Sequence, residues 1–481
     1  MKLLSRIHSG YLFLFSFLTA FVITPLFQKG LFGDGLMYLT VAFNRCKGYG
    51  SFWKQHYSQT SMSFFCEQPP LYFESLGWMY RLFGGSAAAE KLFTLLLLLL
   101  TVFLCIKIWN LLTHGRYKKI AWLPILFTFC VPVFAWSFCN QVIETMVVPL
   151  ALGVFYLQLN YLHSGHTNKR VFSFFGIILL LIALFLTKGI QSCFLAAALF
   201  FAAVTTDKRR FSKTAMKGLL LFVASVGACG LIFIMNADAM FWLESYFNKR
   251  IVATFNHKGA TATSHFEIMI RYFSELLPVI VICALISVWL IVRRKYSWAL
   301  QWGHFKKNAG ALWLILISLS ASLPLAVTLE QRGFYLTPSF PFAALALCLL
   351  YRRYLLVILG RLTKRAPVLL PAAGLAAAAA AGVFFIVCRN NYKRDEDMIK
   401  DVARIKTLVK KGSLIGINQS TWNTFSLHSY LNMANDNSLA VTDTLEYFIQ
   451  EKENKDKIPA EYKRIDISTL DVDLYRKRTN P

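Results

Sequence analysis

The chain has 481 residues, of which 56% are hydrophobic and only 16% are charged, and its mean hydropathy is +0.49. Soluble proteins carry charge on about a quarter of their residues, so this composition excludes an ordinary soluble enzyme. The formal net charge of +26 sits in short basic clusters between apolar runs, with almost no acid among them, which opposes a nucleic-acid partner. The clusters are Arg116–Lys119, Lys169–Arg170, Lys208–Lys217, Arg293–Lys295, Lys306–Lys307 and Arg352–Arg365.

Repeated apolar runs of roughly 18 to 22 residues predict an α-helical polytopic membrane protein. Hydropathy predicts about eleven transmembrane helices within residues 1–388, which we take as one domain. We expect them near 11–28, 88–110, 120–138, 145–162, 171–187, 189–205, 217–236, 275–292, 310–329, 334–351 and 367–388. The first run could pass for a signal peptide, but it lacks a small-x-small cleavage site and many spans follow, so we expect it to be retained.

The distribution of charge predicts the orientation. Lys2 and Arg6 place the N-terminus inside, and the basic clusters then also fall inside. An odd number of spans puts the C-terminus outside. The acids that fall on the outer side are Asp34, Glu67, Glu144, Asp238, Glu244, Glu267, Glu275 and Glu330.

Residues 29–84 form the first outer loop, rich in aromatics and punctuated by Gly and Pro. Tyr and Trp favour the membrane–water boundary, so we expect juxtamembrane helices here. Acids held near lipid are costly unless they have a function, which makes this loop the candidate reactive one. The ten cysteines show no CxxC pairing and predict no zinc or redox site. Cys46 and Cys66 share the loop and are either a disulfide or two free thiols.

From residue 389 to 481 the composition changes to that of a small α/β domain, extracytoplasmic if the topology holds. DEDMIKDVARIKTLVKKG predicts an amphipathic helix that ends at a Gly cap, and TFSLHSYLNMA predicts a second helix. SLIGIN, SLAVTD and YKRIDIS predict strands.

Two acids near the outer membrane edge are candidate catalytic residues. Asp34 follows the first span and Glu144 precedes the fourth, so two carboxylates could converge on one cleft. Such a pair supplies a general base and a partner for a metal or cation. The alternative for each is helix capping or a solvated loop acid.

Cations and histidines complete the set of candidates. Lys188 and Arg332 lie at outer helix junctions, where a cation suits a phosphate at headgroup level, or simply snorkels to the interface. His257 and His265 share one outer loop and are candidate metal ligands, although a lone loop histidine is often just solvated.

The order of short motifs over roughly the first 350 residues resembles the GT-C superfamily of polyprenyl-phosphate-sugar glycosyltransferases. The most similar branch is the bacterial one related to protein O-mannosyltransferases and the lipid A aminoarabinose transferase. Asp34 and Tyr38 match the family's D-E-x-x-Y, with Gly35 in place of the Glu. The other matching segments are Glu67-Gln68-Pro69-Pro70-Leu71-Tyr72-Phe73, Leu82-Phe83-Gly84, Leu186-Thr187-Lys188-Gly189, His265 ahead of Leu277-Pro278, and Arg332-Gly333-Phe334-Tyr335 with Pro338 and Pro341.

The resemblance implies a sugar donor on polyprenyl phosphate, used in the bacterial inner membrane on its outer face, with inversion at the anomeric carbon. It implies Asp34 and Glu144 as catalytic acids, and a divalent metal (Zn, Mg or Mn) bound by Glu67 and His265, or by His257 instead. The carrier and its phosphate would contact Lys188, Arg332, Tyr38, Tyr72 and Tyr335. No nucleotide cofactor is expected, because no convincing Gly-rich phosphate loop is present. The acceptor would be a lipid such as lipid A, a glycan or a protein.

Two other classes remain open. A transporter or flippase of lipid-linked sugars would carry ionisable residues deep at mid-membrane, whereas those noted here cluster at the outer edge. An inactive homologue that serves as a scaffold is the other alternative, motivated by Gly35 and Glu144.

Overall fold

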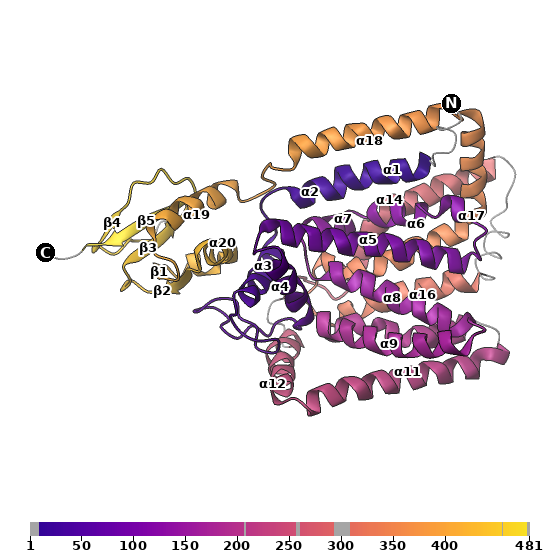
Figure 1. The fold of residues 1–481 in the computed structure, drawn as a ribbon, viewed down its shortest axis with the longest axis horizontal. Coiled ribbons are helices and arrows are strands. Elements are labelled where there is room, and N and C mark those ends of the chain that lie inside the picture. The colour runs from indigo at the N-terminus through magenta and orange to yellow at the C-terminus, as the bar shows by residue number, and fades with distance from the viewer. Residues whose placement is uncertain (1–8, 206–207, 256–259, 293–307, 455, 479–481) are drawn as a thin grey trace.

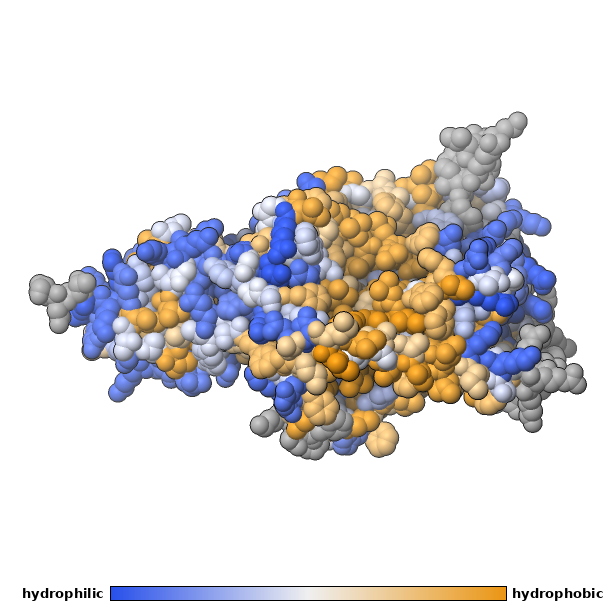
Figure 2. Space-filling model, turned by 60° about the horizontal axis from the view of Figure 1, so that its bottom comes forward, coloured by the Kyte–Doolittle hydropathy of each residue, from blue (hydrophilic) through white to orange (hydrophobic). Residues whose placement is uncertain are grey.

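A computed structural model describes residues 9–205, 208–255, 260–292, 308–454 and 456–478. Long helices run side by side in a bundle, and a small domain of strands and helices projects from one end of it, called here the domain-bearing end (Figure 1). On the face shown in Figure 2, orange apolar side chains cover the bundle, while mostly hydrophilic surface covers the small domain and the opposite end. That layering is the one expected of a protein that crosses a bilayer.

Within the described residues, nine helical segments are long and apolar enough to cross a membrane. They are Ser9–Phe27 (α1 Ser9–Leu18, η2 Thr19–Ile23 and α2 Thr24–Phe27), Ala87–Leu112 (α5), Glu144–His163 (α8), Thr167–Thr205 (α9 Thr167–Lys188, η4 Gly189–Ala197 and α10 Ala198–Thr205), Phe211–Ile234 (in α11 Lys208–Ile234), Glu267–Val292 (α14), Ala309–Val327 (α16 Ala309–Ser322 and η6 Leu323–Val327), Gly333–Arg365 (η7 Gly333–Ser339 and α17 Phe340–Arg365) and Leu369–Cys388 (α18). Helices are the expected solution, because lipid offers no partner for a free backbone N–H or C=O.

One predicted span is broken. The run predicted near 120–138 is a pair of helices, Lys118–Phe129 (η3 Lys118–Ile120 and α6 Leu123–Phe129) and α7 Pro132–Cys139, bent by 80°. Pro132 explains the break, because proline cannot donate the backbone bond that a continuous helix needs.

The spans predicted near 171–187 and 189–205 form one apolar stretch, Thr167–Thr205, in which Gly189 separates α9 from η4 at a φ of 69°. Ten spans result if the bent pair is one crossing and this stretch is another, whereas the prediction of about eleven counted its two parts separately.

Short helices cover the domain-bearing end. α3 (Gly33–Cys46) and α4 (Leu71–Leu82) lie in the first predicted loop and pack against each other. α12 (Ala237–Tyr246), η5 (Phe247–Val252) and α13 (Ala253–Phe255) follow α11 at the same end (Figure 1). Cys46 and Cys66 are both free thiols, so the loop is held by packing and not by a disulfide.

The C-terminal domain contains a five-stranded sheet in the order β2-β1-β3-β5-β4. Its elements are α19 (Glu396–Leu408), β1 (Leu414–Ile417), η8 (Thr421–Asn423), α20 (Phe425–Asn435), β2 (Ser438–Val441), β3 (Tyr447–Glu451), β4 (Tyr462–Arg464) and β5 (Val472–Lys477). β1 pairs in parallel with β2 and β3, and β5 runs antiparallel to β3 and β4. Both predicted helices and the three predicted strands are present, while β3 and β5 were not predicted.

The C-terminal domain docks on the bundle through α20, which packs against α3. Lys47 forms an ion pair with Asp436 just after α20. The Tyr57 hydroxyl lies 2.8 Å from Ser429 Oγ, a hydrogen bond buried between the two parts. α3 is therefore held from both sides, by the membrane helices and by the C-terminal domain.

Candidate functional site

The start of α3 presents Asp34, which lies in the first turn of the helix and is half-buried. The turn between α7 and α8 positions it, since the Phe32 N–H donates to Asn140 Oδ1 at 3.1 Å. Gly35 is required at this contact: a Cβ added there would lie 2.0 Å from the Asn140 carbonyl oxygen. The Glu that the family pattern has here would clash in this chain, so Gly35 is a packing requirement of this fold.

Glu144 and Lys188 form a buried ion pair behind α3. They come from the start of α8 and the end of α9, and their charged atoms are 2.8 Å apart with side chains 1% and 4% exposed. An acid at a helix N-terminus and a cation at a helix C-terminus are each favoured by the helix dipole. The Lys188 ammonium also lies 4.7 Å from the centre of the Tyr335 ring. The two charges thus neutralise each other inside the fold, and the Lys188 ammonium packs against the Tyr335 ring.

Arg250 and Glu330 form a second ion pair that the sequence motifs did not identify. Tyr335 joins it, donating its hydroxyl to Glu330 Oε1 at 3.0 Å and lying 3.3 Å from Arg250 Nη2. Thr254 Oγ1 donates to the other Glu330 oxygen at 3.3 Å. Charge-assisted bonds of this kind are about twice as strong as neutral ones, so these side chains are fixed relative to one another.

Electrostatics link the two pairs to the first loop. Burial raises the pKa of Tyr38 well above its usual value, and the carboxylates of Asp34 and Glu144 raise it further. Partial burial also raises the pKa of Glu67, which the Arg250 guanidinium opposes. Asp34, Glu67, Tyr38 and the two ion pairs therefore influence one another electrostatically, although they come from six separate parts of the chain.

The other predicted residues lie elsewhere. Arg332 lines a hollow of about 490 Å³ together with Arg271 and Glu275, and its side chain has no hydrogen-bond or ion-pair partner in the described part of the chain. Tyr72 is completely buried and donates its hydroxyl to the Gln141 carbonyl at 2.8 Å. His265 is exposed, with Nδ1 2.8 Å from the Ala326 carbonyl oxygen, and His257 falls outside the described residues.

A metal site is not apparent where it was predicted. Among the residues described, no three His, Cys, Asp or Glu side chains converge in a way that could hold an ion. Glu67 interacts with Arg250, Glu330 and Asp34, while His265 is tied to a backbone carbonyl. A metal held by Glu67 and His265 stays a prediction.

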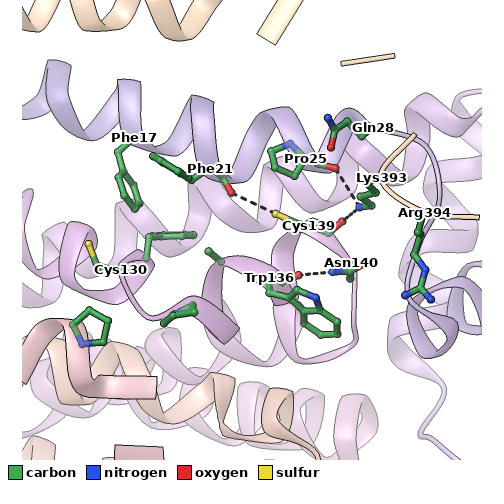
Figure 3. Close-up of a pocket in the computed structure, with 14 residues that line it drawn as sticks. Phe17, Phe21, Pro25, Gln28, Cys130, Trp136, Cys139, Asn140, Lys393 and Arg394 are labelled. Carbon is green, nitrogen blue, oxygen red and sulfur yellow. Dashed lines mark hydrogen bonds between the residues drawn. The ribbon is translucent and has the colours of Figure 1, made fainter. Parts of the chain in front are cut away.

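A groove of about 700 Å³ lies between the first span and the bent pair α6–α7, with Lys393 and Arg394 at one end (Figure 3). Its walls are mainly apolar, and Trp136 separates it from the hollow around Arg332. The rings of Phe32, Trp136 and Phe334 are in contact, with centroids 5.1 to 5.8 Å from that of Trp136. Phe334 in turn contacts Tyr335, so this aromatic layer stands between the groove and the charged cluster.

No family model and no curated protein matches the sequence. The structure is similar to that of ArnT from Cupriavidus metallidurans bound to undecaprenyl phosphate, with a TM-score of 0.65, 12% identity, and coverage of 97% of this chain and 98% of that chain. The apo state of the same protein also scores 0.65 at 12% identity, over 95% of this chain and 96% of that one. A similarity at this identity shows the fold, and it confirms the predicted architecture of a bundle of membrane helices followed by a small C-terminal domain.

Proposed function

We propose that this protein is a multi-pass membrane glycosyltransferase that moves a sugar from a polyprenyl-phosphate carrier to an acceptor at the domain-bearing end. That end would face the outer, periplasmic side of a bacterial inner membrane, because the basic clusters around Arg116, Lys208 and Arg361 lie at or just outside those ends of the spans that are opposite to it. The observation that carries the proposal is the convergence of Asp34 and Glu67 with the Arg250–Glu330 pair on a GT-C fold.

The reaction would be a direct displacement with inversion. The acceptor hydroxyl oxygen forms the new bond to the anomeric carbon, and its proton passes to the Asp34 carboxylate. The bond between that carbon and the phosphate oxygen breaks, and the electron pair leaves with the polyprenyl phosphate. A general base within about 3 Å of the hydroxyl contributes roughly 10²–10⁴-fold to such a step.

Arg250 is the cation that best suits the leaving phosphate. Both cations pair with an acid, but the Arg250 side chain is 25% exposed and the Lys188 side chain only 4%. Positive charge aimed at developing negative charge is the largest single contribution in many enzymes. Arg332 would contact the phosphate from the neighbouring hollow, and Tyr38 and Tyr335 would line the carrier's headgroup side.

Glu144 and Lys188 would act together from behind this site. Their opposite charges stay fixed during the reaction and contribute a constant electrostatic field at the site. The Lys188 ammonium also holds the Tyr335 ring in place. No step is assigned to a metal, since Glu67 and His265 do not form a binding group among the described residues.

The test is turnover by the purified protein in lipid nanodiscs with a panel of radiolabelled polyprenyl-phosphate sugars and envelope extracts as acceptors. Wild type should transfer label, and Asp34→Asn should lose about 10²–10⁴-fold of the rate while staying folded. Asp238→Asn is the matched control, because this exposed Asp lies at the same end in a surface ion pair with Lys54. Undiminished transfer by Asp34→Asn overturns its assignment as the base. Movement of labelled carrier across the bilayer without transfer favours a flippase. The absence of both transfer and carrier movement favours a scaffold.

A further inference from the structure

The groove between the first span and α6–α7 has one open apolar side. Phe17, Phe21 and Pro25 form one wall, and Trp136 with Pro278 of α14 forms part of the opposite one (Figure 3). Phe21 is 61% exposed although it belongs to a membrane-spanning segment, so its exposure is toward lipid. An acyl or prenyl chain in the bilayer can therefore reach the groove from the side.

Two cations close the groove at the domain-bearing end. Lys393 reaches back from the linker after α18 and donates to the Pro25 carbonyl at 3.1 Å and to the Cys139 carbonyl. An ammonium has three N–H donors, so one remains for another acceptor. Lys393 forms no ion pair with an acid in the described part of the chain, and Arg394 pairs only with its neighbour Asp395 at 3.3 Å.

Further cations strengthen the positive field at this end. Lys91 of α5 donates to the Phe27 carbonyl at 2.8 Å, and Lys29 lies 4.9 Å from the centre of the Tyr392 ring. The acid nearest to them on α5, Glu90, is buried and accepts from the Tyr80 hydroxyl at 2.6 Å. Positive charges at the membrane edge attract anionic lipid headgroups.

We propose that this groove binds a membrane lipid, with its anionic phosphate headgroup on Lys393 and Arg394 and its apolar chain along Phe17 and Phe21. The site is distinct from the charged cluster of Glu144, Lys188, Arg250 and Glu330, none of which lines the groove, and it borders the turn that carries Asp34 through Asn140. It is also independent of the proposed transfer reaction, since it is defined by binding alone.

The apolar walls distinguish a lipid from free phosphate. A free phosphate would satisfy the third Lys393 donor but would leave Phe17, Phe21 and Pro278 uncovered. A lipid satisfies both, because its apolar chain packs along these walls while its phosphate accepts a hydrogen bond from Lys393. The proposal therefore commits to a lipid-borne phosphate.

The test is lipid binding to the full-length protein in detergent, followed by native mass spectrometry and by the shift in thermal unfolding midpoint. The probes are phosphatidylglycerol, phosphatidylcholine, diacylglycerol and inorganic phosphate. Phosphatidylglycerol should bind and stabilise the wild type, with diacylglycerol and inorganic phosphate weaker by about tenfold or more.

Variants then locate the site. Lys393→Gln should weaken phosphatidylglycerol binding about tenfold, and Lys393→Arg should retain most of it. Lys410→Gln, an exposed lysine of the C-terminal domain, is the control and should bind like the wild type. If Lys393→Gln fails to fold, Arg394→Gln replaces it, because that side chain is 44% exposed. Equal binding of phosphatidylglycerol by these variants, or an equal effect of phosphatidylcholine or inorganic phosphate, overturns the proposal.

Discussion

The Nζ atom of Lys188 lies 2.8 Å from a carboxylate oxygen of Glu144, and both side chains are almost completely buried. A buried pair gains Coulomb energy only by giving up the hydration of both ions, so its net contribution to stability is small. Removing one partner is different, because it leaves a single buried charge without compensation. The pair therefore ties the start of α8 to the end of α9, and neither residue can be replaced alone without leaving the other as an uncompensated buried charge.

That constraint predicts a non-additive double-mutant cycle. Glu144→Met and Lys188→Met should each lower the free energy of unfolding by about 3–5 kcal/mol, since each leaves the other group uncompensated. The double change Glu144→Met with Lys188→Met should cost clearly less than the sum of the single changes. Denaturant unfolding in detergent, followed by fluorescence, measures all three variants. Additive losses would show that the two side chains act independently.

Arg250 should be sensitive even to replacement by another cation. Arg250→Lys keeps the charge but loses the planar group that faces both Glu330 and Tyr335. If Arg250 holds the leaving phosphate, turnover should fall by about 10- to 100-fold with little change in the unfolding midpoint. Arg464→Lys, an exposed arginine on β4, is the control and should keep wild-type turnover. Turnover that Arg250→Lys leaves intact would contradict the assigned contact.

Hydropathy predicted most of the fold because the bilayer leaves the backbone so few alternatives. The apolar runs that became α5, α8 and α18 are long enough to cross, and only a helix satisfies their backbone groups in lipid. The breaks were harder to place. Pro132 was visible in the sequence as a helix start, but hydropathy averaged over the window hid the 80° bend beside it.

The C-terminal domain shows a second reason why sequence patterns miss part of the fold. β1 and β2 were predicted because short apolar runs end at turn residues. β3 was missed although it lies at the centre of the sheet, because Gln450 interrupts its apolar pattern. The structure resolves that conflict: the Gln450 amide donates to the carbonyls of Asn454 and Asp456 at 2.8 Å each. These partners lie four and six residues further along the chain, in the loop after β3, but the alternation of apolar and polar residues does not show that such bonds form.

In the candidate site, too, some residues were predicted from the sequence and others were found only in the structure. Motif order identified Asp34, Glu67 and Lys188, and the fold brings the elements that carry them to one end of the bundle, although their roles stay predictions. Arg250 and Glu330 were not identified as a pair, because they lie 80 positions apart in sequence. Their pairing is a property of tertiary packing, and no spacing rule connects a π-helical turn with the loop before η7.

Gly189 should tolerate no side chain. It has a φ of 69°, and an added Cβ would lie 2.3 Å from the Tyr246 hydroxyl. Gly189→Ala should therefore lower the free energy of unfolding by about 1–3 kcal/mol and lower the unfolding midpoint. Gly227→Ala is the matched control, since this helical glycine in α11 has no atom within 4 Å of an added Cβ. The control should be neutral or slightly stabilising, and an equal loss in both variants would contradict a special role for Gly189.

Lipid binding in the groove should weaken as the pH rises from 7 to 9. Burial lowers the pKa of Lys393 to about 8, with Lys91 and Arg394 lowering it and Cys139 and Glu90 opposing them. Below that pKa the amine is charged and attracts the headgroup; above it the amine is neutral and the attraction is lost. Phosphatidylglycerol keeps its charge over this range, so the affinity should fall by about tenfold between pH 7 and pH 9.

The arginine variant separates this titration from other effects of pH. An arginine stays protonated throughout the range, so Lys393→Arg should bind phosphatidylglycerol with a nearly flat pH profile. Lys410→Gln should keep the wild-type profile, because its exposed side chain takes no part in the groove. The affinities are measured by titrating lipid into the full-length protein at each pH and counting bound lipid by native mass spectrometry. A wild-type profile that stays flat would mean that the Lys393 ammonium does not contact the lipid phosphate.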